Sequence, residues 1–130
     1  MENRIPAVLL HGSTELFVGL KFALEGLSIE TTQVRTCEEV RQLLSGPVPP
    51  RLVFTGATLP DGSWKEVVEA AAEAKAPASV IVVNRIPDHR LYMDAMYHGA
   101  CDFITPPFEG LKHIVASAIR NVPRAAVGTC

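Results

Sequence analysis

The chain has 130 residues, which suits one domain with a sizeable buried core. Twelve basic and fourteen acidic side chains give a formal net charge of −2, and no run of Lys or Arg could follow a phosphate backbone, so we expect no direct nucleic-acid binding by this domain. The N-terminal residues lack the pattern of a signal peptide and no apolar stretch has the length of a membrane span, so we expect a cytoplasmic protein without membrane association.

The three cysteines give no sign of a metal site. Cys37, Cys101 and Cys130 lie far apart and include no C-x-x-C pair. A zinc site built from cysteines needs ligand pairs at short spacing, so none is indicated. An odd number of widely spaced cysteines suits a reducing cytoplasm.

The first third of the chain alternates between strand and helix patterns. A continuous apolar run at 7–10 predicts a strand covered on both faces. Apolar residues then recur at helical spacing over 16–27, where Ser13 or Thr14 can cap the first turn. Residues 28–34 combine β-branched residues with polar alternation, which is typical of an edge strand.

Two capping boxes mark the starts of the next two helices. Thr36 and Glu39 open one helix, and Ser63 and Glu66 open another that Pro77 ends. In a capping box the hydroxyl and the carboxylate each satisfy a backbone N–H that would otherwise be unpaired. Between the two helices, an apolar run at 51–55 predicts a buried strand, and a polar loop containing glycines follows it.

The remaining elements continue the alternation. The strongest strand pattern of the chain covers 79–84, and a helix follows that Pro87 and Asp88 open and that Gly99 ends. The last strand is expected at 101–104 and the last helix at about 109–122.

Five strands alternating with five helices imply right-handed crossovers and a parallel sheet covered on both faces. We therefore predict a doubly wound, three-layer α/β domain with five parallel strands over residues 1–122, and a tail or the start of a linker at 123–130. Ligands bind such sheets outside the carboxyl ends of the strands. The loops expected to meet at that edge are 11–14, 55–61 and 84–88, with 105–106 beside them.

Three short segments carry a likeness to a known family. They are Leu-Pro-Asp-Gly at 59–62, Gly-Ala at 99–100, and Asp-Phe-Ile-Thr-Pro-Pro-Phe at 102–108. Their order and spacing resemble the receiver domains of two-component response regulators from about residue 7 to residue 121. The resemblance implies the (βα)5 flavodoxin-like topology of receivers.

The same resemblance assigns the phosphorylation positions of the family to residues of this chain. It places His11 and Gly12 where receivers have an acidic pair, Gly56 at the phosphoryl-accepting Asp, Asn84 at the Ser or Thr, and Pro106 at the Lys. Magnesium prefers charged oxygen ligands, and an acyl phosphate requires a carboxylate nucleophile. These side chains offer neither, so we expect no catalytic residue, no metal and no cofactor.

Neighbouring residues do not supply the carboxylate that is missing at Gly56. Strand alternation points Thr55 away from the acceptor position, and Asp61 lies five residues after Gly56 and fits a turn before Gly62. The Gly-Ser-Thr sequence at 12–14 could bind an anion through free N–H groups, although an ordinary helix cap explains it as well.

The resemblance also implies a switch position and an interface. Phe103 matches the aromatic residue that changes rotamer on activation, although a core aromatic explains it equally well. The bond between Pro106 and Pro107 matches one that is commonly cis in receivers. Receivers often dimerise through the fourth helix, fifth strand and fifth helix. The candidate contact residues on this face are Arg90, Met93, Tyr97, Lys112 and His113.

Two functions therefore follow from the sequence. The first is a receiver-like regulatory domain that works without phosphorylation, has no enzymatic activity and acts through contacts with itself or with another signalling protein. The alternative is a sensor of a small ligand or anion at the remodelled carboxyl edge of the sheet. A flavin enzyme of similar fold is a distant third, because the only tryptophan, Trp64, lies in a capping box.

Overall fold

The computed structural model describes residues 5–10, 15–108 and 110–120. Its main sheet has five strands in the order β2-β1-β3-β6-β7, and every neighbouring pair is parallel. The strands are β1 (Ile5–Leu10), β2 (Ile29–Val34), β3 (Leu52–Thr55), β6 (Ser79–Val83) and β7 (Asp102–Ile104). The predicted doubly wound sheet is therefore confirmed.

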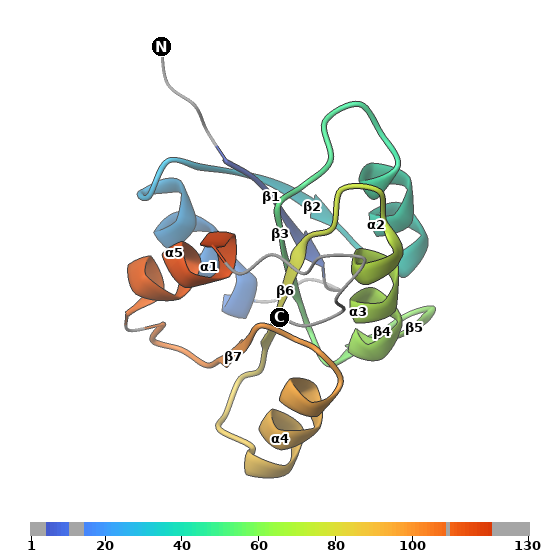
Figure 1. Cartoon of the computed structure of the whole chain (residues 1–130). Helices are drawn as coiled ribbons and strands as arrows, with labels where there is room; N and C mark the ends of the chain where they lie inside the picture. The colour runs from blue at the N-terminus through green and yellow to red at the C-terminus, as the bar shows by residue number, and fades with distance from the viewer. Residues whose placement is uncertain (1–4, 11–14, 109, 121–130) are drawn as a thin grey trace.

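Helices cover both faces of this sheet, which gives three layers (Figure 1). On one face lie α1 (Glu15–Glu25) and α5 (Leu111–Arg120). On the other lie α2 (Cys37–Leu44), α3 (Trp64–Glu73) and α4 (His89–Tyr97). No helix in the described part of the chain is long and apolar enough to cross a membrane.

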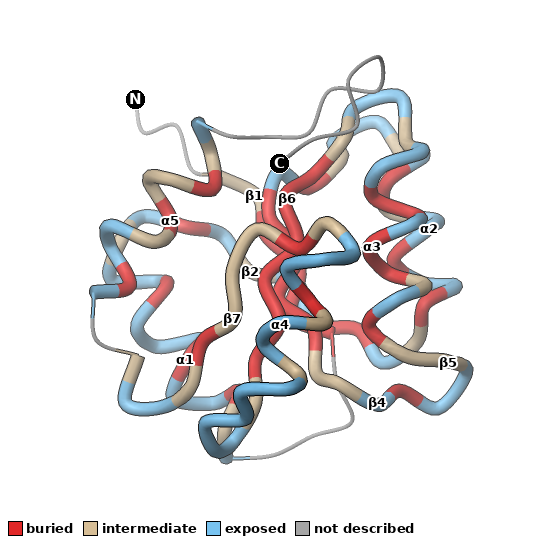
Figure 2. Tube along the Cα trace, turned by 60° about the horizontal axis from the view of Figure 1, so that its bottom comes forward, coloured by how far each residue is buried: buried red, intermediate tan, exposed pale blue. Residues whose placement is uncertain are grey.

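Side chains alternate between the two faces because successive residues of a strand point to opposite sides. In β6, Val80 and Val82 pack with α2 and α3, whereas Ile81 and Val83 pack with α1 and α5. All five residues of β6 are buried, which explains why its sequence is a continuous apolar run. Buried residues accordingly follow the strands of the sheet and the inner sides of the helices (Figure 2).

Both predicted capping boxes are present. Thr36 and Glu39 close the first turn of α2, and Ser63 and Glu66 close the first turn of α3. However, α3 ends at Glu73 rather than close to Pro77, because Ala74 already has an extended backbone.

The loop predicted after β3 contains secondary structure of its own. Two short strands, β4 (Thr58–Leu59) and β5 (Gly62–Ser63), pair antiparallel there. Gly62 begins β5 at a position where an added Cβ atom would lie 2.6 Å from a carboxylate oxygen of Glu66, and the side chain of Leu59 is buried in the core beside α3. This small hairpin fixes where Asp61 lies.

Candidate functional site: the carboxyl edge of the sheet

The positions assigned to phosphorylation lie where the strands end. The backbone N–H of Gly56 donates to the carbonyl of Leu10 over 3.0 Å, and that of Asn84 donates to the carbonyl of Ile104 over 3.0 Å. These bonds tie the residue after β3 to the end of β1, and the residue after β6 to the end of β7. Gly56 and Asn84 therefore both lie at the carboxyl edge of the sheet, as the sequence predicted. Two of the other assigned positions, His11 and Gly12, lie outside the described residues.

The polar side chains at this edge donate hydrogen bonds to backbone carbonyls of their own loops. The Asn84 amide donates to the carbonyl of Ile86 over 2.9 Å, so it shapes its own loop. Thr55 is fully buried, and its hydroxyl donates to the carbonyl of Gly56 over 2.9 Å. Because Gly56 itself has no side chain, neither β3 nor the residue after it offers a nucleophile.

Asp61, the carboxylate nearest to Gly56 in the sequence, binds the backbone of α2. One of its oxygens accepts the backbone N–H of Cys37 over 2.9 Å, and the other accepts that of Glu38 over 3.3 Å. It therefore caps the N-terminus of α2 from the β4–β5 turn. These bonds, that from Cys37 first, hold the pKa of Asp61 below its ordinary value.

Sequence reasoning missed this long-range cap and took Asp61 for a turn residue only. A signal was available, because Thr36 satisfies the N–H of Glu39 and leaves those of Cys37 and Glu38 in need of acceptors. Burial and the nearby Asp61 charge also raise the pKa of the Cys37 thiol to about 11. Cys37 is therefore no candidate nucleophile at neutral pH.

The donor set does not fit a magnesium ion. Among the described residues, no group of three or more His, Cys, Asp or Glu side chains is placed to hold a metal. Gly56 and Asn84 contribute only backbone groups and a neutral amide, whereas Mg²⁺ in proteins is bound through carboxylates and waters in octahedral geometry.

The loop after β7 contains Pro106, which the resemblance assigns to the lysine position. Pro106 is exposed and uncharged, and the Pro106–Pro107 peptide bond is cis, as the resemblance implied. The next residue, Phe108, has a φ of 62° and donates its N–H to the carbonyl of Thr105 over 3.0 Å. Nothing in this loop could neutralise a transferring phosphoryl group.

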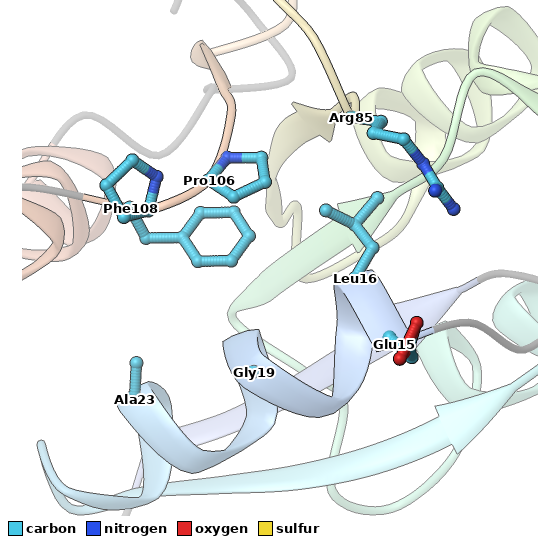
Figure 3. A pocket seen from close by; sticks show the side chains of 8 residues that line it. Glu15, Leu16, Gly19, Ala23, Arg85, Pro106 and Phe108 are labelled. Carbon is cyan, nitrogen blue, oxygen red and sulfur yellow. The ribbon is translucent and has the colours of Figure 1, made fainter.

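A pocket of about 410 Å³ opens between this loop and α1 (Figure 3). Leu16, Gly19 and Ala23 of α1 line one side, and the segment 106–108 lines the other. Glu15 and Arg85 complete the lining, the latter from the loop after β6. Sequence reasoning did not find this pocket, because its lining comes from three separate segments.

Phe103, which the resemblance assigns to the switch aromatic position, lies in β7 with its ring against α4. Its half-buried ring meets that of Tyr92 edge to face, with 6.0 Å between centroids. Both rings line a second pocket of about 290 Å³, together with residues that begin α4. The ring also packs against the core on the α3 side, so its place agrees with a core role as well as with a switch role.

The candidate interface residues are all exposed: Arg90, Met93 and Tyr97 on α4, and Lys112 and His113 on α5. Only Ala95 of α4 is buried, so this helix is mostly exposed (Figure 2). Met93 is 55% exposed and Tyr97 is 87% exposed. An apolar surface of this kind on a small domain is typical of contact sites.

Comparison with known proteins agrees with this geometry. The sequence is 27% identical over 120 residues to the response regulator protein PilR of Pseudomonas aeruginosa, a match that covers 91% of this chain but 27% of PilR. The chain thus spans about a quarter of that relative. No family model matches the sequence.

Solved structures show the same arrangement. The signal receiver domain of a LuxO repressor protein from Vibrio parahaemolyticus superimposes with a TM-score of 0.76 at 25% identity, covering 92% of each chain. Full-length FixJ from B. japonicum superimposes with a TM-score of 0.77 at 22% identity, covering 96% of this chain and 62% of that one. An adenylate cyclase from Rhodopirellula baltica shares the fold at 17% identity and a TM-score of 0.72. In sequence and in fold, the chain is therefore similar to the receiver domains of response regulators.

Proposed function

We propose that this receiver domain regulates without being phosphorylated, through contacts with other proteins. The observation that carries the proposal is the end of β3, where Gly56 has no side chain and the Thr55 hydroxyl is buried and donates to a backbone carbonyl. Asp61 is committed to the N-terminus of α2. Phosphoryl transfer to a receiver needs a carboxylate at the end of β3, and the described residues place none at that position.

The electrostatic support for the reaction is missing as well. Pro106 carries no charge, and Asn84 donates its amide to its own loop. Phosphoryl transfer relies on cations that neutralise the charge of the transferred group, so a carboxylate alone would react poorly. We therefore infer that the loss of the carboxylate at Gly56 and the loss of the cation at Pro106 act together.

The test is intact mass spectrometry after incubation with acetyl phosphate and Mg²⁺. We expect an unchanged mass for the wild-type chain, with a phosphorylatable receiver as the positive control. The Gly56→Asp variant, which restores only the carboxylate, should also stay unmodified. A phosphoryl adduct on the wild-type chain would contradict the proposal. An adduct on the variant alone would mean that the loss rests on Gly56 and not on the missing cations.

The surface proposed for contacts is the face of α4, β7 and α5. Self-association through this face should appear as a dimer mass in light scattering at high concentration. Tyr97→Glu should shift the protein to monomer, because it places a charge among the exposed apolar residues of α4, of which Tyr97 is the most exposed. Val48→Glu is the matched control, since Val48 is 71% exposed and lies before β3. A wild-type monomer at high concentration would exclude self-association and favour another signalling partner.

We propose that residues 1–122 act as a regulatory domain within a longer regulator, with 123–130 as the start of a linker to an output domain. The match to only 27% of PilR and 62% of full-length FixJ supports this organisation. In this proposal the domain performs no catalysis and binds no nucleic acid directly. Its cytoplasmic location stays a prediction of the sequence.

A second candidate function is sensing of a small ligand at the remodelled edge. The pocket between α1 and the 106–108 segment favours it, because the pocket opens beside the position of the lost lysine. Apolar concave sites with a few polar groups are where proteins bind small molecules.

A further inference from the structure

The pocket between α1 and the 106–108 segment has two chemically different ends (Figure 3). Phe108 and Pro106 lie at one end, facing Ala23 and Gly19 of α1. The volume of about 410 Å³ falls within the range of small-molecule sites, and most of the lining is apolar. A ligand would therefore lay an apolar body along α1 at this end.

Gly19 faces open space at this end of the pocket. A Cβ atom added to Gly19 would meet no atom within 4 Å, and its backbone is not in the positive-φ region. Glycine in the middle of a helix is less stable than alanine, so neither the neighbours nor the backbone of α1 explain its presence. The effect that remains is room in the pocket.

The other end carries two opposite charges. Glu15 and Arg85 both line the pocket there, and both side chains are exposed. No ion pair joins these two described residues. The guanidinium can bind a carboxylate through two parallel hydrogen bonds, and the carboxylate of Glu15 can accept from an ammonium group. A ligand head that carries both charges would satisfy both side chains.

We propose that this pocket binds a free α-amino acid with a large apolar side chain. Its carboxylate binds Arg85, its ammonium group binds Glu15, and its side chain lies over Gly19 against Phe108. The inference rests on the sensing function proposed above and names its ligand class. A ligand in this position touches α1 and the loops after β6 and β7, so it joins three segments that meet at the carboxyl edge.

The experiment is calorimetric titration of the full chain in magnesium-free buffer, so that it is independent of the phosphorylation test. The probes are L-phenylalanine, L-leucine, 3-phenylpropionate, which lacks the ammonium group, and phenethylamine, which lacks the carboxylate. We expect L-phenylalanine to bind at least about tenfold more tightly than either single-charge analogue. Arg85→Ala should remove the preference over the amine, and Glu15→Gln the preference over the acid.

The control pair is at Gly19. Gly19→Leu should fill the pocket and abolish binding, whereas Gly19→Ala should retain most of it and raise the Tm. Absence of binding at millimolar amino acid, or amino-acid binding that Gly19→Leu leaves unchanged, overturns the proposal. If an analogue with one charge binds as tightly as L-phenylalanine and Gly19→Leu abolishes it, the pocket is a ligand site but the amino-acid assignment is wrong.

Discussion

One buried hydrogen bond joins α5 to the sheet, and the effect of its removal on stability should be measurable. The hydroxyl of Ser79, at the start of β6, donates to the carbonyl of Ala118 over 2.7 Å, and Ser79 is fully buried. Ala118 lies in the last turn of α5, where carbonyls have no partner within the helix. The substitution Ser79→Ala removes this donor and leaves the carbonyl without it.

The expected loss in the free energy of unfolding follows from this burial. Leaving a buried acceptor unsatisfied costs roughly 1–3 kcal/mol. For a domain of this size, each kcal/mol shifts Tm by about 4 °C, so the variant should melt roughly 4–12 °C below the wild type. The Ser45→Ala variant is the matched control, because the Ser45 hydroxyl also donates to a carbonyl, that of Arg41, over 3.0 Å, but at an exposed site.

Urea unfolding followed by the fluorescence of Trp64, which is 4% exposed, gives the free energy of unfolding directly. We expect a lower midpoint with an unchanged slope for Ser79→Ala, and a change within about 0.5 kcal/mol for Ser45→Ala. If Ser79→Ala changes the free energy of unfolding no more than the control does, the bond does not stabilise the docking of α5.

Three further predictions use the same unfolding and labelling measurements. Gly99→Ala should lower the free energy of unfolding by about 1–2 kcal/mol, because Gly99 has a φ of 107°. Gly26→Ala is the control, because the backbone of Gly26 is not in the positive-φ region. Equal effects of the two substitutions would contradict the argument. Asp61→Asn should weaken the fall of the free energy of unfolding as the pH is lowered into the acid range. The folded-state pKa of Asp61 lies below its ordinary value of 3.8, so its contribution is present above that pH and is lost as the pH falls through the folded-state value. If the free energies of unfolding of the wild type and of Asp61→Asn depend on pH in the same way, Asp61 does not stabilise α2. Cys37, with a pKa of about 11, should react with iodoacetamide at pH 7.5 far more slowly in the folded chain than in urea, and equal rates would contradict its burial.

Most of the fold could be predicted from the sequence because its signals are local. The apolar run of β6 is continuous since both faces of the strand are covered, and the boxes at Thr36 and Ser63 act within one helical turn. Strand order then places the residues after β3 and β6 at one edge, which is why Gly56 and Asn84 were expected there.

What the sequence determined by itself is therefore the layered sheet, the loops that meet at its carboxyl edge, and the absence of a carboxylate at Gly56. Only the tertiary structure decided that Asp61 caps α2, that Ser79 holds α5, and that Glu15, Arg85 and Phe108 line one pocket. The reason is physical: capping boxes and apolar periodicity act between residues a few positions apart. These other contacts join segments that become neighbours only once the helices have packed on the sheet.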